Sequence, residues 1–185
     1  MTIVLASASP RRKELLGNIC KDFQVLVPSV DEEKIAEKYQ GNPRRTVRAL
    51  SRAKALAARG QSPSADAVIG ADTVVALGRV ILGKPSSREE GRAMLKMLSG
   101  RTHKVWTGVT VSFAGRTVTY AVCTRIRFYP LTDTQINEYV DSGEGEDKAG
   151  GYGIQGSAGA FVKRIRKDYF NVVGLPLRRL SRLLG

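Results

Sequence analysis

The chain of 185 residues is poor in the residues that several common enzyme classes require. It has one histidine, His103, which leaves little room for a Ser–His–Asp triad or a histidine-based zinc site. Its two cysteines, Cys20 and Cys123, lie far apart and form no CxxC pair, so we expect free thiols and a reducing, cytoplasmic location. Neither the GxGxxG nor the P-loop spacing occurs, which excludes the two commonest nucleotide-binding motifs.

Long hydrophobic runs, internal repeats and linkers are also missing. No apolar stretch approaches the ~18 residues that span a membrane, so we expect no membrane partner. The apolar stretch TIVLA at residues 2–6 follows no basic segment, which indicates a buried strand and not a signal peptide. Hydrophobic residues make up 42% of the chain, which argues against disorder. We therefore expect one domain over residues 1–185.

Acidic residues are scarce relative to basic ones. There are 30 lysines and arginines against 17 acids, which gives a formal net charge of +13. This excess predicts a polyanionic partner, either nucleic acid or small phosphorylated molecules. The basic residues are scattered over positions 11–13, 44–52, 163–167 and 178–182 without a dominant run. A solvated basic surface without a nucleic-acid partner explains the scatter equally well.

Apolar periodicity and capping residues predict an α/β fold with a mixed, partly antiparallel sheet. We expect strands at residues 2–6, 23–29, 66–77, 104–113, 116–130 and 160–165. We expect helices at residues 9–16, 42–60, 87–100 and 132–143, and from about residue 176 onward. Asn42 followed by Pro43 marks the start of the second helix, and Ser87 with Glu90 forms a capping box at the start of the third.

The first predicted helix begins in an unusual way. In the stretch SASPRRKELL, Ser9 is a suitable N-cap and Pro10 a suitable first residue, but Arg11 and Arg12 place two cations in the first turn. The helix dipole disfavours cations there. A bound phosphate removes the conflict, because the helix N-terminus, the Ser9 hydroxyl and both guanidinium groups are all phosphate donors. The stretch therefore predicts a phosphate site.

Asp72 is a carboxylate inside the apolar stretch VIGADTVVAL, where burial costs several kcal/mol unless the group is paired or binds a metal. Gly70 beside it permits either close approach of another backbone or a β-bulge. Lys54 lies on the apolar stripe of its helix with Val47 and Leu50, and considered alone it is better explained by a stem that reaches out to solvent than by function.

Two further segments carry polar residues of uncertain role. Lys84, in ILGKP, is by itself an ordinary turn lysine. The glycine-rich stretch at residues 141–159 is long for a compact domain and holds Gln155, while Tyr152 and Ile154 indicate a loop that packs down.

A carboxylate cluster, VDEEK, follows the second predicted strand at residues 30–34. Solvent exposure is the default interpretation for such acids. If the cluster lies near Asp72, two or three carboxylates could hold Mg²⁺ or Mn²⁺ together with substrate phosphates.

Five stretches in this order, SASPRRKELL, GADTVV, ILGKP, LSGRTHKVWTGV and DKAGGYGIQG, resemble the Maf (septum formation inhibitor) proteins over almost the whole chain. The resemblance implies a Maf/inosine-triphosphatase-like α/β fold, with a long twisted sheet and two lobes around a deep cleft. It implies a nucleoside triphosphate pyrophosphatase that uses a divalent cation, Mg²⁺, Mn²⁺ or Co²⁺, and forms a homodimer.

The resemblance also assigns roles to residues. The catalytic aspartate falls on Asp72, and the acidic pair after the second strand falls on Asp31 and Glu32, with Glu33 as an alternative. Three positions, Arg12, Thr73 and Gln155, match the branch that acts on dTTP and UTP, not the branch for 7-methyl-GTP. The phosphate-binding residues fall on Ser7, Ser9, Arg11, Arg12, Lys54 and Lys84.

The residues leave two points of mechanism and function open. Asp72 can act as the general base for water or hold a metal that lowers the pKa of the water. A basic nucleic-acid-binding protein explains the charge but not Asp72 or the glycine-rich loop, and a regulatory protein without enzymatic activity is suggested by the family name alone.

Overall fold

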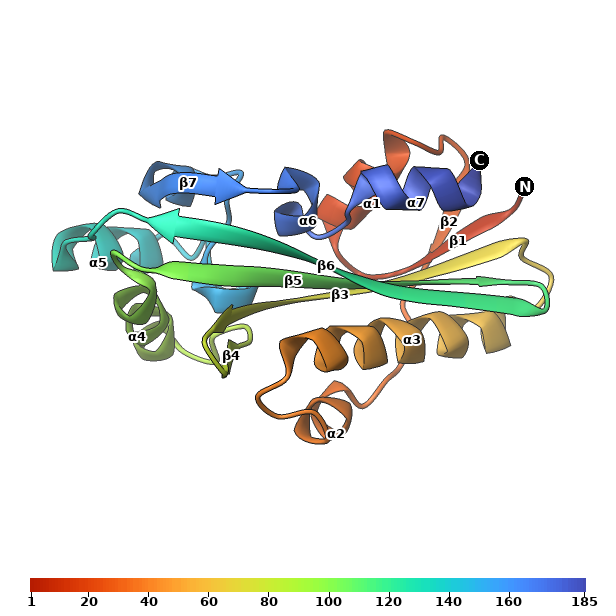
Figure 1. The fold of residues 1–185 in the computed structure, drawn as a ribbon, viewed down its shortest axis with the longest axis horizontal. Coiled ribbons are helices and arrows are strands. Elements are labelled where there is room, and N and C mark those ends of the chain that lie inside the picture. Colours follow the sequence, from red (N-terminus) through yellow and green to blue (C-terminus); the bar gives the residue numbers. More distant parts are fainter.

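The computed structural model describes residues 1–185 and confirms an α/β fold built on one mixed, twisted sheet (Figure 1). The strand order is β2-β1-β3-β5-β6-β7, and β4 pairs with β3. β1 pairs in parallel with β2 and β3, and the other pairs are antiparallel. The strands are β1 Ile3–Ala6, β2 Phe23–Leu26, β3 Ala67–Leu77, β4 Val80–Leu82, β5 Thr102–Phe113, β6 Arg116–Phe128 and β7 Val162–Arg166.

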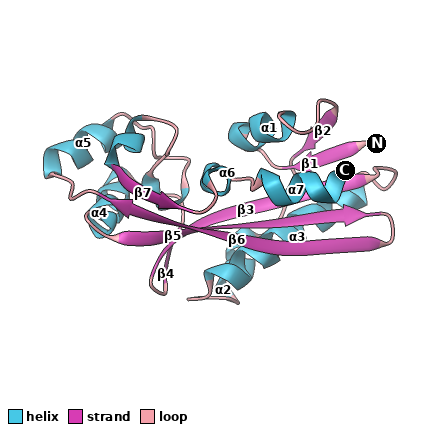
Figure 2. Cartoon of the chain, turned by 45° about the horizontal axis from the view of Figure 1, so that its top comes forward, coloured by secondary structure: helices cyan, strands magenta, loops and turns pink.

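Helices cover both faces of this sheet (Figure 2). α3 lies along one face, while α1, α6 and α7 lie on the other, and α4 and α5 pack at the far end of the long strands (Figure 1). The helices are α1 Pro10–Gly17, α2 Glu32–Glu37, α3 Pro43–Gln61, α4 Arg88–Leu98, α5 Asp133–Asp141, α6 Tyr169–Val173 and α7 Leu177–Leu184. None of them has the length and apolar character needed to cross a bilayer.

Two glycines in the sheet let α3 lie unusually close to it. A Cβ atom at Gly70 of β3 would overlap the carbonyl oxygen of Ser51, and one at Gly108 of β5 would overlap that of Val47. The close approach predicted for Gly70 is therefore confirmed. This contact also fixes the distance between α3 and the sheet, which determines which side chains of α3 can contact β3.

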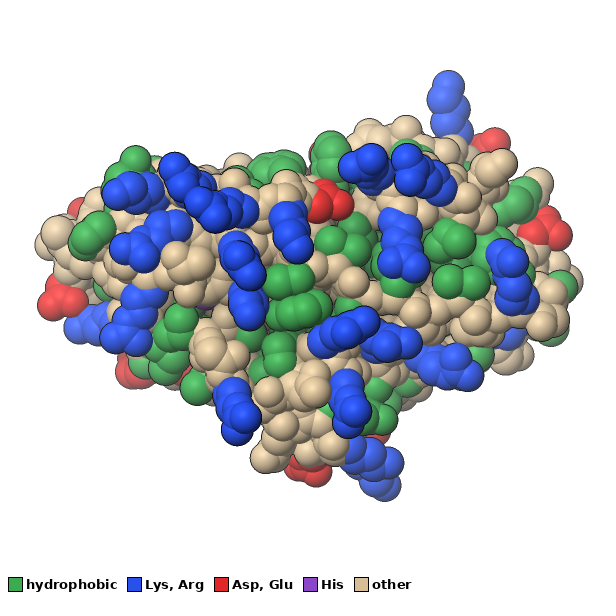
Figure 3. Space-filling model, viewed as in Figure 1, with side chains coloured by type: hydrophobic (Ala, Val, Ile, Leu, Met, Phe, Trp, Pro, Cys, Tyr) green, Lys and Arg blue, Asp and Glu red, His purple; other side chains and the backbone are tan.

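Basic side chains are spread over much of the surface. In Figure 3, lysines and arginines occur across the whole visible face, and one group of them lies over β7 and the adjoining ends of β5 and β6. Most basic side chains have no carboxylate partner. The exceptions are Arg11, Lys54, Arg88, Arg92, Lys96 and Lys148.

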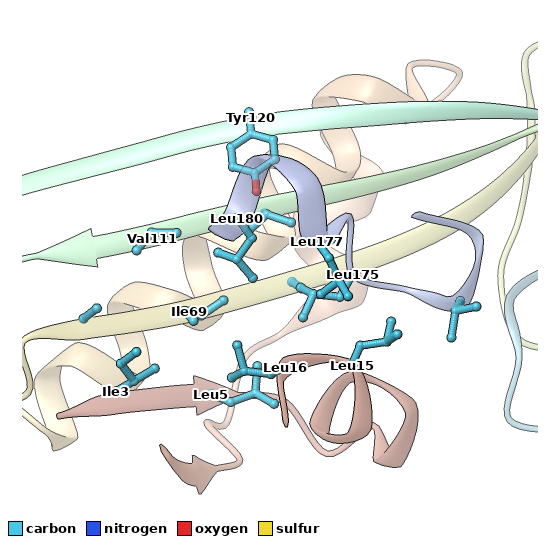
Figure 4. Packing of buried hydrophobic residues seen from close by; sticks show 14 residues of the cluster. Ile3, Leu5, Leu15, Leu16, Ile69, Val111, Tyr120, Leu175, Leu177 and Leu180 are labelled. Atoms are coloured by element: carbon cyan, nitrogen blue, oxygen red, sulfur yellow. The ribbon is translucent and has the colours of Figure 1, made fainter. Parts of the chain in front are cut away.

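The interior divides into two main apolar clusters, one at each end of the sheet, as expected for two lobes. In the first, Leu15 and Leu16 of α1 and Leu180 of α7 pack toward Leu5 and neighbouring residues of the sheet (Figure 4). The second joins α4 and α5 to the sheet and includes Leu95, Leu98, Ile126, Phe128, Ile136 and Tyr152. β3 and β5 contribute to both clusters, so a continuous sheet connects the lobes.

Two short helices were not predicted. The VDEEK stretch, expected as acids after a strand, forms α2, and Asp31 caps it by accepting a hydrogen bond from the Lys34 N–H. α6 begins in the same way after Asp168. Both are too short to show helical periodicity, so the capping residue was their only signal.

The predicted capping box of α4 is half correct. The Ser87 side chain accepts from the Glu90 N–H, but the Glu90 carboxylate bonds to the backbone N–H and hydroxyl of Ser86 instead of the backbone of Ser87.

Candidate functional site

The candidate site lies at a gap in the sheet. Along one edge of β3, β1 pairs as far as Gly70, and β4 pairs only from Val75 onward. The residues between them, 71–74, have no strand neighbour on that edge. The carboxyl ends of the parallel strands β1 and β2 open at the same place, which is where α/β sheets bind ligands. A cavity of about 1310 Å³ opens at this gap.

Asp72 stands in this gap on the face of the sheet that α3 covers. Its side chain is 10% exposed, and its Oδ1 accepts a hydrogen bond from Lys54 Nζ at 2.7 Å. The same ammonium group lies 3.0 Å from Oε1 of Glu32 on α2. The close packing of α3 at Gly70 therefore sets a lysine between two carboxylates. Lys54 does not extend into solvent, so the preferred interpretation of this residue taken alone was wrong.

The turn from β1 into α1 supplies two hydroxyl groups. Ser9 caps α1 by accepting from the Arg12 N–H at 3.4 Å, and the Oγ of Ser7 accepts from the Ser9 N–H at 3.2 Å. Neither hydroxyl donates its own proton to a protein group. Both residues line the cavity, so both protons remain available to an anionic ligand.

Arg12 is held rigidly between three segments. Its Nε donates to the Gly174 carbonyl at 2.9 Å, its Nη1 to Ser7 Oγ at 3.2 Å and its Nη2 to Thr73 Oγ1 at 3.0 Å. Burial lowers the pKa of the Arg12 guanidinium, and the charge of Asp72 offsets part of that effect. Each terminal nitrogen still has one uncommitted N–H, and a fixed fork of this kind suits phosphate oxygens.

The contact between Arg12 and Thr73 is the first step of a directional chain of hydrogen bonds. Thr107 Oγ1 lies 3.0 Å from Thr73 Oγ1 and donates to the Asn171 carbonyl at 2.8 Å. A threonine hydroxyl has one proton, so Thr107 has none left for Thr73, and Thr73 must be the donor between them. Thr73 therefore cannot donate to a ligand while this chain is intact. It acts on a ligand through the orientation of Arg12.

Arg11 spans the cavity to the glycine-rich loop. Its Nη1 lies 3.1 Å from Asp147 Oδ2, and Lys148 Nζ lies 2.6 Å from the other oxygen of the same carboxylate. Burial opposes ionisation of Asp147, but the hydrogen bonds from Lys148 and Arg11 outweigh it and lower the pKa of the carboxyl. The two sides of the cleft are thus joined by one exposed acid between two cations.

The glycine-rich loop is held in place by Glu144, which also lines the cavity. This carboxylate accepts from the backbone N–H of Ser157 at 3.1 Å and from its hydroxyl at 2.7 Å, and it receives the Tyr139 hydroxyl at 3.4 Å. A Cβ atom at Gly156 would overlap the same carboxylate. A larger residue at this position would therefore have to displace the Glu144 carboxylate from its bonds to Ser157.

A second anchor holds the loop from inside the lobe. Tyr152 is 5% exposed, and its hydroxyl lies 2.7 Å from Nε2 of the buried His103. Burial raises the pKa of the Tyr152 phenol and lowers that of His103 to about 4. Gln155, between the two anchors, is exposed, lines the cavity and makes no side-chain hydrogen bond. Its amide is free to meet a ligand, and the prediction of a loop that packs down is confirmed.

The predicted site residues converge on this cavity with one exception. Asp31 caps α2 and does not line the cavity, whereas Glu33 does. The trio of Asp31, Glu32 and Asp72 therefore does not gather, and no group of three potential metal-ligating side chains occurs anywhere in the chain. The lining residues include Ser7, Ser9, Arg11, Arg12, Glu32, Lys54, Asp72, Thr73, Lys84 and Gln155.

Sequence reasoning did not find Thr107, Asn171, Glu144 or Asp147. Thr107 and Asn171 lie far from Thr73 in the chain, and only the β3–β5 register and α6 bring them together. Glu144 and Asp147 had a weak signal, since they are acids in a loop otherwise rich in glycine.

The fold and site define an α/β protein with a cation-rich cleft around one buried carboxylate. A model of the Maf-like protein family matches residues 2–185, and the chain belongs to this family. The dTTP/UTP pyrophosphatase of Carboxydothermus hydrogenoformans is 48% identical, over 100% of this chain and 97% of that protein. The dTTP/UTP pyrophosphatase of Thermococcus onnurineus is 47% identical, over 98% and 95%. Among solved structures, the Staphylococcus aureus Ham1 protein aligns with a TM-score of 0.45 and 17% identity, over 69% of this chain and 72% of that one.

Proposed function

We propose that this protein hydrolyses dTTP and UTP at the α–β phosphoanhydride, which releases the nucleoside monophosphate and pyrophosphate. The observation that carries the proposal is the gap in β3, where buried Asp72 faces Lys54 and the donors of the α1 turn across one cavity. Relatives that match over their whole length carry the name dTTP/UTP pyrophosphatase, which supports this choice of substrates.

The α1 turn is suited to the triphosphate. Its free backbone N–H groups, the two uncommitted hydroxyl protons and the open N–H groups of Arg12 have no acceptor within the protein and belong to residues that line the cavity. Lys84, exposed after β4, adds a flexible cation on the opposite rim. These groups stabilise the negative charge that develops on the departing pyrophosphate, which is the larger electrostatic contribution in phosphoryl transfer.

We assign the transfer of the proton to Asp72. Lys54 holds its Oδ1, and its Oδ2 accepts no hydrogen bond from the protein. Water attacks the phosphoanhydride, the bond to the bridging oxygen breaks, and the proton of the water goes to the open oxygen of Asp72. Lys54 holds the carboxylate in a fixed orientation through its hydrogen bond to Oδ1.

A divalent cation fits the same two carboxylates. Glu32 and Asp72 already converge on one positive charge, and Mg²⁺ is commonly held by one or two carboxylates together with substrate phosphates. When bound there with the triphosphate, such an ion neutralises phosphate charge and lowers the pKa of a nearby water. We do not include Asp31 among the ligands, because its carboxylate caps α2 and the residue does not line the cavity.

Gln155 is suited to recognise the base. Its amide offers one acceptor and donors, which complement the adjacent C=O and N–H groups shared by thymine and uracil, whereas cytosine presents a different pattern. The anchors at Glu144 and Tyr152 hold the backbone on both sides of it. Arg12 and Thr73, the other two specificity positions, act together through their hydrogen bond.

The decisive test is product analysis over a panel of nucleotides with Mg²⁺, Mn²⁺ or Co²⁺. Ion-exchange chromatography should show monophosphate and pyrophosphate from dTTP and UTP, and much less product from CTP and 7-methyl-GTP. Preparations of the Asp72→Asn variant control for contaminating hydrolases. Release of single phosphates would contradict the cleavage site, and no turnover of any nucleotide would favour a non-enzymatic role.

We also propose a homodimer in a reducing, cytoplasmic compartment. The family resemblance supports the dimer, and the unpaired Cys20 and Cys123 are compatible with the compartment. Light scattering after size exclusion would test the dimer, and fluorescence microscopy of a tagged chain would test the location.

A further inference from the structure

One face of the sheet carries rows of cations at the end far from the α1 turn. In the register of β5, β6 and β7, Lys104 pairs with Arg125, and Arg125 pairs with Arg166. In the next row, Arg127 pairs with Arg164. Residues paired across strands lie on the same face of a sheet, about 4.8 Å apart, and residues two apart along a strand share that face too. All of these side chains are exposed.

This arrangement works against the stability of the fold. Like charges directly opposite each other on neighbouring strands are destabilising. None of these cations has a carboxylate within ion-pair distance. All ion pairs of the protein are formed by other lysines and arginines. The opposite face of the same strands is covered, since Ile126 and Phe128 pack in the apolar cluster with α4 and α5. The exposed face is therefore a bare basic surface that nothing in the chain neutralises.

Neighbouring groups extend the surface. Burial raises the pKa of the Cys123 thiol, and the nearby charges of Lys104, Lys167 and Arg125 lower it. Lys167 therefore lies close enough to Cys123 to belong with the cations of this surface. α3 packs on this face of the sheet at Gly108. Its exposed Arg44, Arg48 and Arg52 follow one another at four-residue spacing, another destabilising arrangement of like charges.

We propose that this face, the β5–β6–β7 basic surface, binds the phosphodiester backbone of nucleic acid. A flat array of unpaired cations in regular rows needs a ligand with many negative charges in sequence, and arginine-rich surfaces of this kind bind phosphates without reading bases. The proposal goes beyond the nucleotide hydrolysis proposed above and does not rest on it. None of Lys104, Arg125, Arg127, Arg164 and Arg166 lines the cleft.

The test uses fluorescence anisotropy with the full chain and labelled 20-nucleotide single-stranded RNA, single-stranded DNA and duplex DNA. The variant Lys104→Gln/Arg125→Gln/Arg166→Gln removes the longest row. The matched control, Lys13→Gln/Lys21→Gln/Arg116→Gln, removes the same charge from exposed positions elsewhere. Because each neutralised phosphate contributes about −0.7 to −0.9 to the slope of log K against log salt, the row variant should flatten that slope by about 2.

We expect the row variant to weaken nucleic-acid binding about tenfold or more at low salt, while the control variant changes it much less. The row variant should also melt at a higher temperature than the wild type, since it removes repulsion, and should retain the wild-type rate of dTTP hydrolysis. Saturating dTTP should not displace the oligonucleotide.

Three results would overturn the proposal. One is equal weakening in the row and control variants, which would mean that net charge alone binds the oligonucleotide. Another is displacement by dTTP, which would place the binding in the cleft. The third is binding to vesicles of phosphatidylcholine and phosphatidylserine without binding to any oligonucleotide, which would identify a membrane surface. The melting temperature shows directly whether each variant is folded.

Discussion

The two walls of the cleft differ in whether their polar side chains are already hydrogen-bonded within the protein. The sheet wall, formed by β1, β3, α1 and α3, keeps its polar groups buried or half-buried and bonded to one another, as with Lys54, Asp72 and Arg12. The loop wall, residues 141–159, presents Gln155 exposed and without a side-chain hydrogen bond, and Glu144 and Tyr152 anchor the backbone on either side of it.

The difference separates two tasks. Charge stabilisation requires groups that do not move during the reaction, so the sheet wall is fixed in advance by its interlocking bonds. Selection of a base requires donors and acceptors that are satisfied only by the correct partner, so the loop wall leaves its amide free. We therefore expect changes to Lys54 and Asp72 of the sheet wall to affect all nucleotides alike, and changes to Gln155 of the loop wall to affect their ranking.

The largest effect is expected from Asp72→Asn, which keeps the shape of the side chain but removes the carboxylate that we propose as general base or metal ligand. We expect kcat to fall about 10³-fold on every nucleotide, with the melting temperature largely retained. Steady-state kinetics with dTTP and UTP measure this. Glu32→Gln is the matched control, since it also removes one partner of Lys54 and should cost less. An Asn variant with half of the wild-type kcat would exclude both roles of Asp72.

Gln155→Ala should flatten the ranking of nucleotides. A bound base covers the exposed Gln155 amide, and a donor or acceptor left unpaired there costs about 1–3 kcal/mol. The preference of kcat/KM for dTTP and UTP over CTP should therefore fall roughly tenfold to a hundredfold. The loss should come from the good substrates. Gln155→Glu, which keeps an acceptor but removes the donors, should give an intermediate ranking. If Gln155→Ala reduces activity equally on all nucleotides, the loop wall has a structural or catalytic task and not a selective one.

Thr107→Val tests whether the directional chain orients Arg12. The change removes the acceptor of the Thr73 proton, so Arg12 should lose part of its alignment. One neutral hydrogen bond contributes about 1 kcal/mol, so KM should rise about fivefold for every triphosphate, with kcat little changed. Thr107→Ser retains the hydroxyl and should restore KM. Equal behaviour of the Val and Ser variants would mean that Thr107 affects packing alone.

The smallest effect on activity, but a measurable one on stability, is expected from pH acting on the loop anchor. Burial lowers the pKa of His103 to about 4, below its ordinary value of about 6.5, so the folded state favours the neutral ring. This contribution is complete above about pH 6.5 and is lost as pH falls from there toward 4, because the unfolded chain binds the proton first. From pH 7 to 5 the loss should be about 2 kcal/mol.

Urea denaturation at pH 7 and pH 5 measures this loss. His103→Asn does not titrate in this range but can still meet the Tyr152 hydroxyl, so it should lose correspondingly less stability between the two values. The carboxylates contribute equally in both proteins. An identical loss in both would mean that the imidazole is not the titrating group.

Local chemistry made most of the elements predictable. The Asn42–Pro43 start of α3 and the hairpin of β5 and β6 follow from capping and from alternation of apolar residues, and both were found. The cations of the α1 turn also signalled a phosphate site, since they conflict with the helix dipole unless an anion is bound. Asp31 shows the limit, because an N-cap and a metal ligand are indistinguishable as an isolated aspartate.

The sequence by itself determined the α/β class, the family motifs and the oddity of a carboxylate at Asp72 inside an apolar strand. Only the tertiary structure decided which partner each polar group has. Lys54 meets Asp72 because Gly70 lets α3 lie against β3. Thr73 donates its hydroxyl proton to Thr107, and not to a ligand, because β5 and α6 place Thr107 and Asn171 beside it. Hydrogen bonds and ion pairs form between atoms a few ångströms apart, and residues far apart in the chain reach that distance only when strand register and helix packing are fixed.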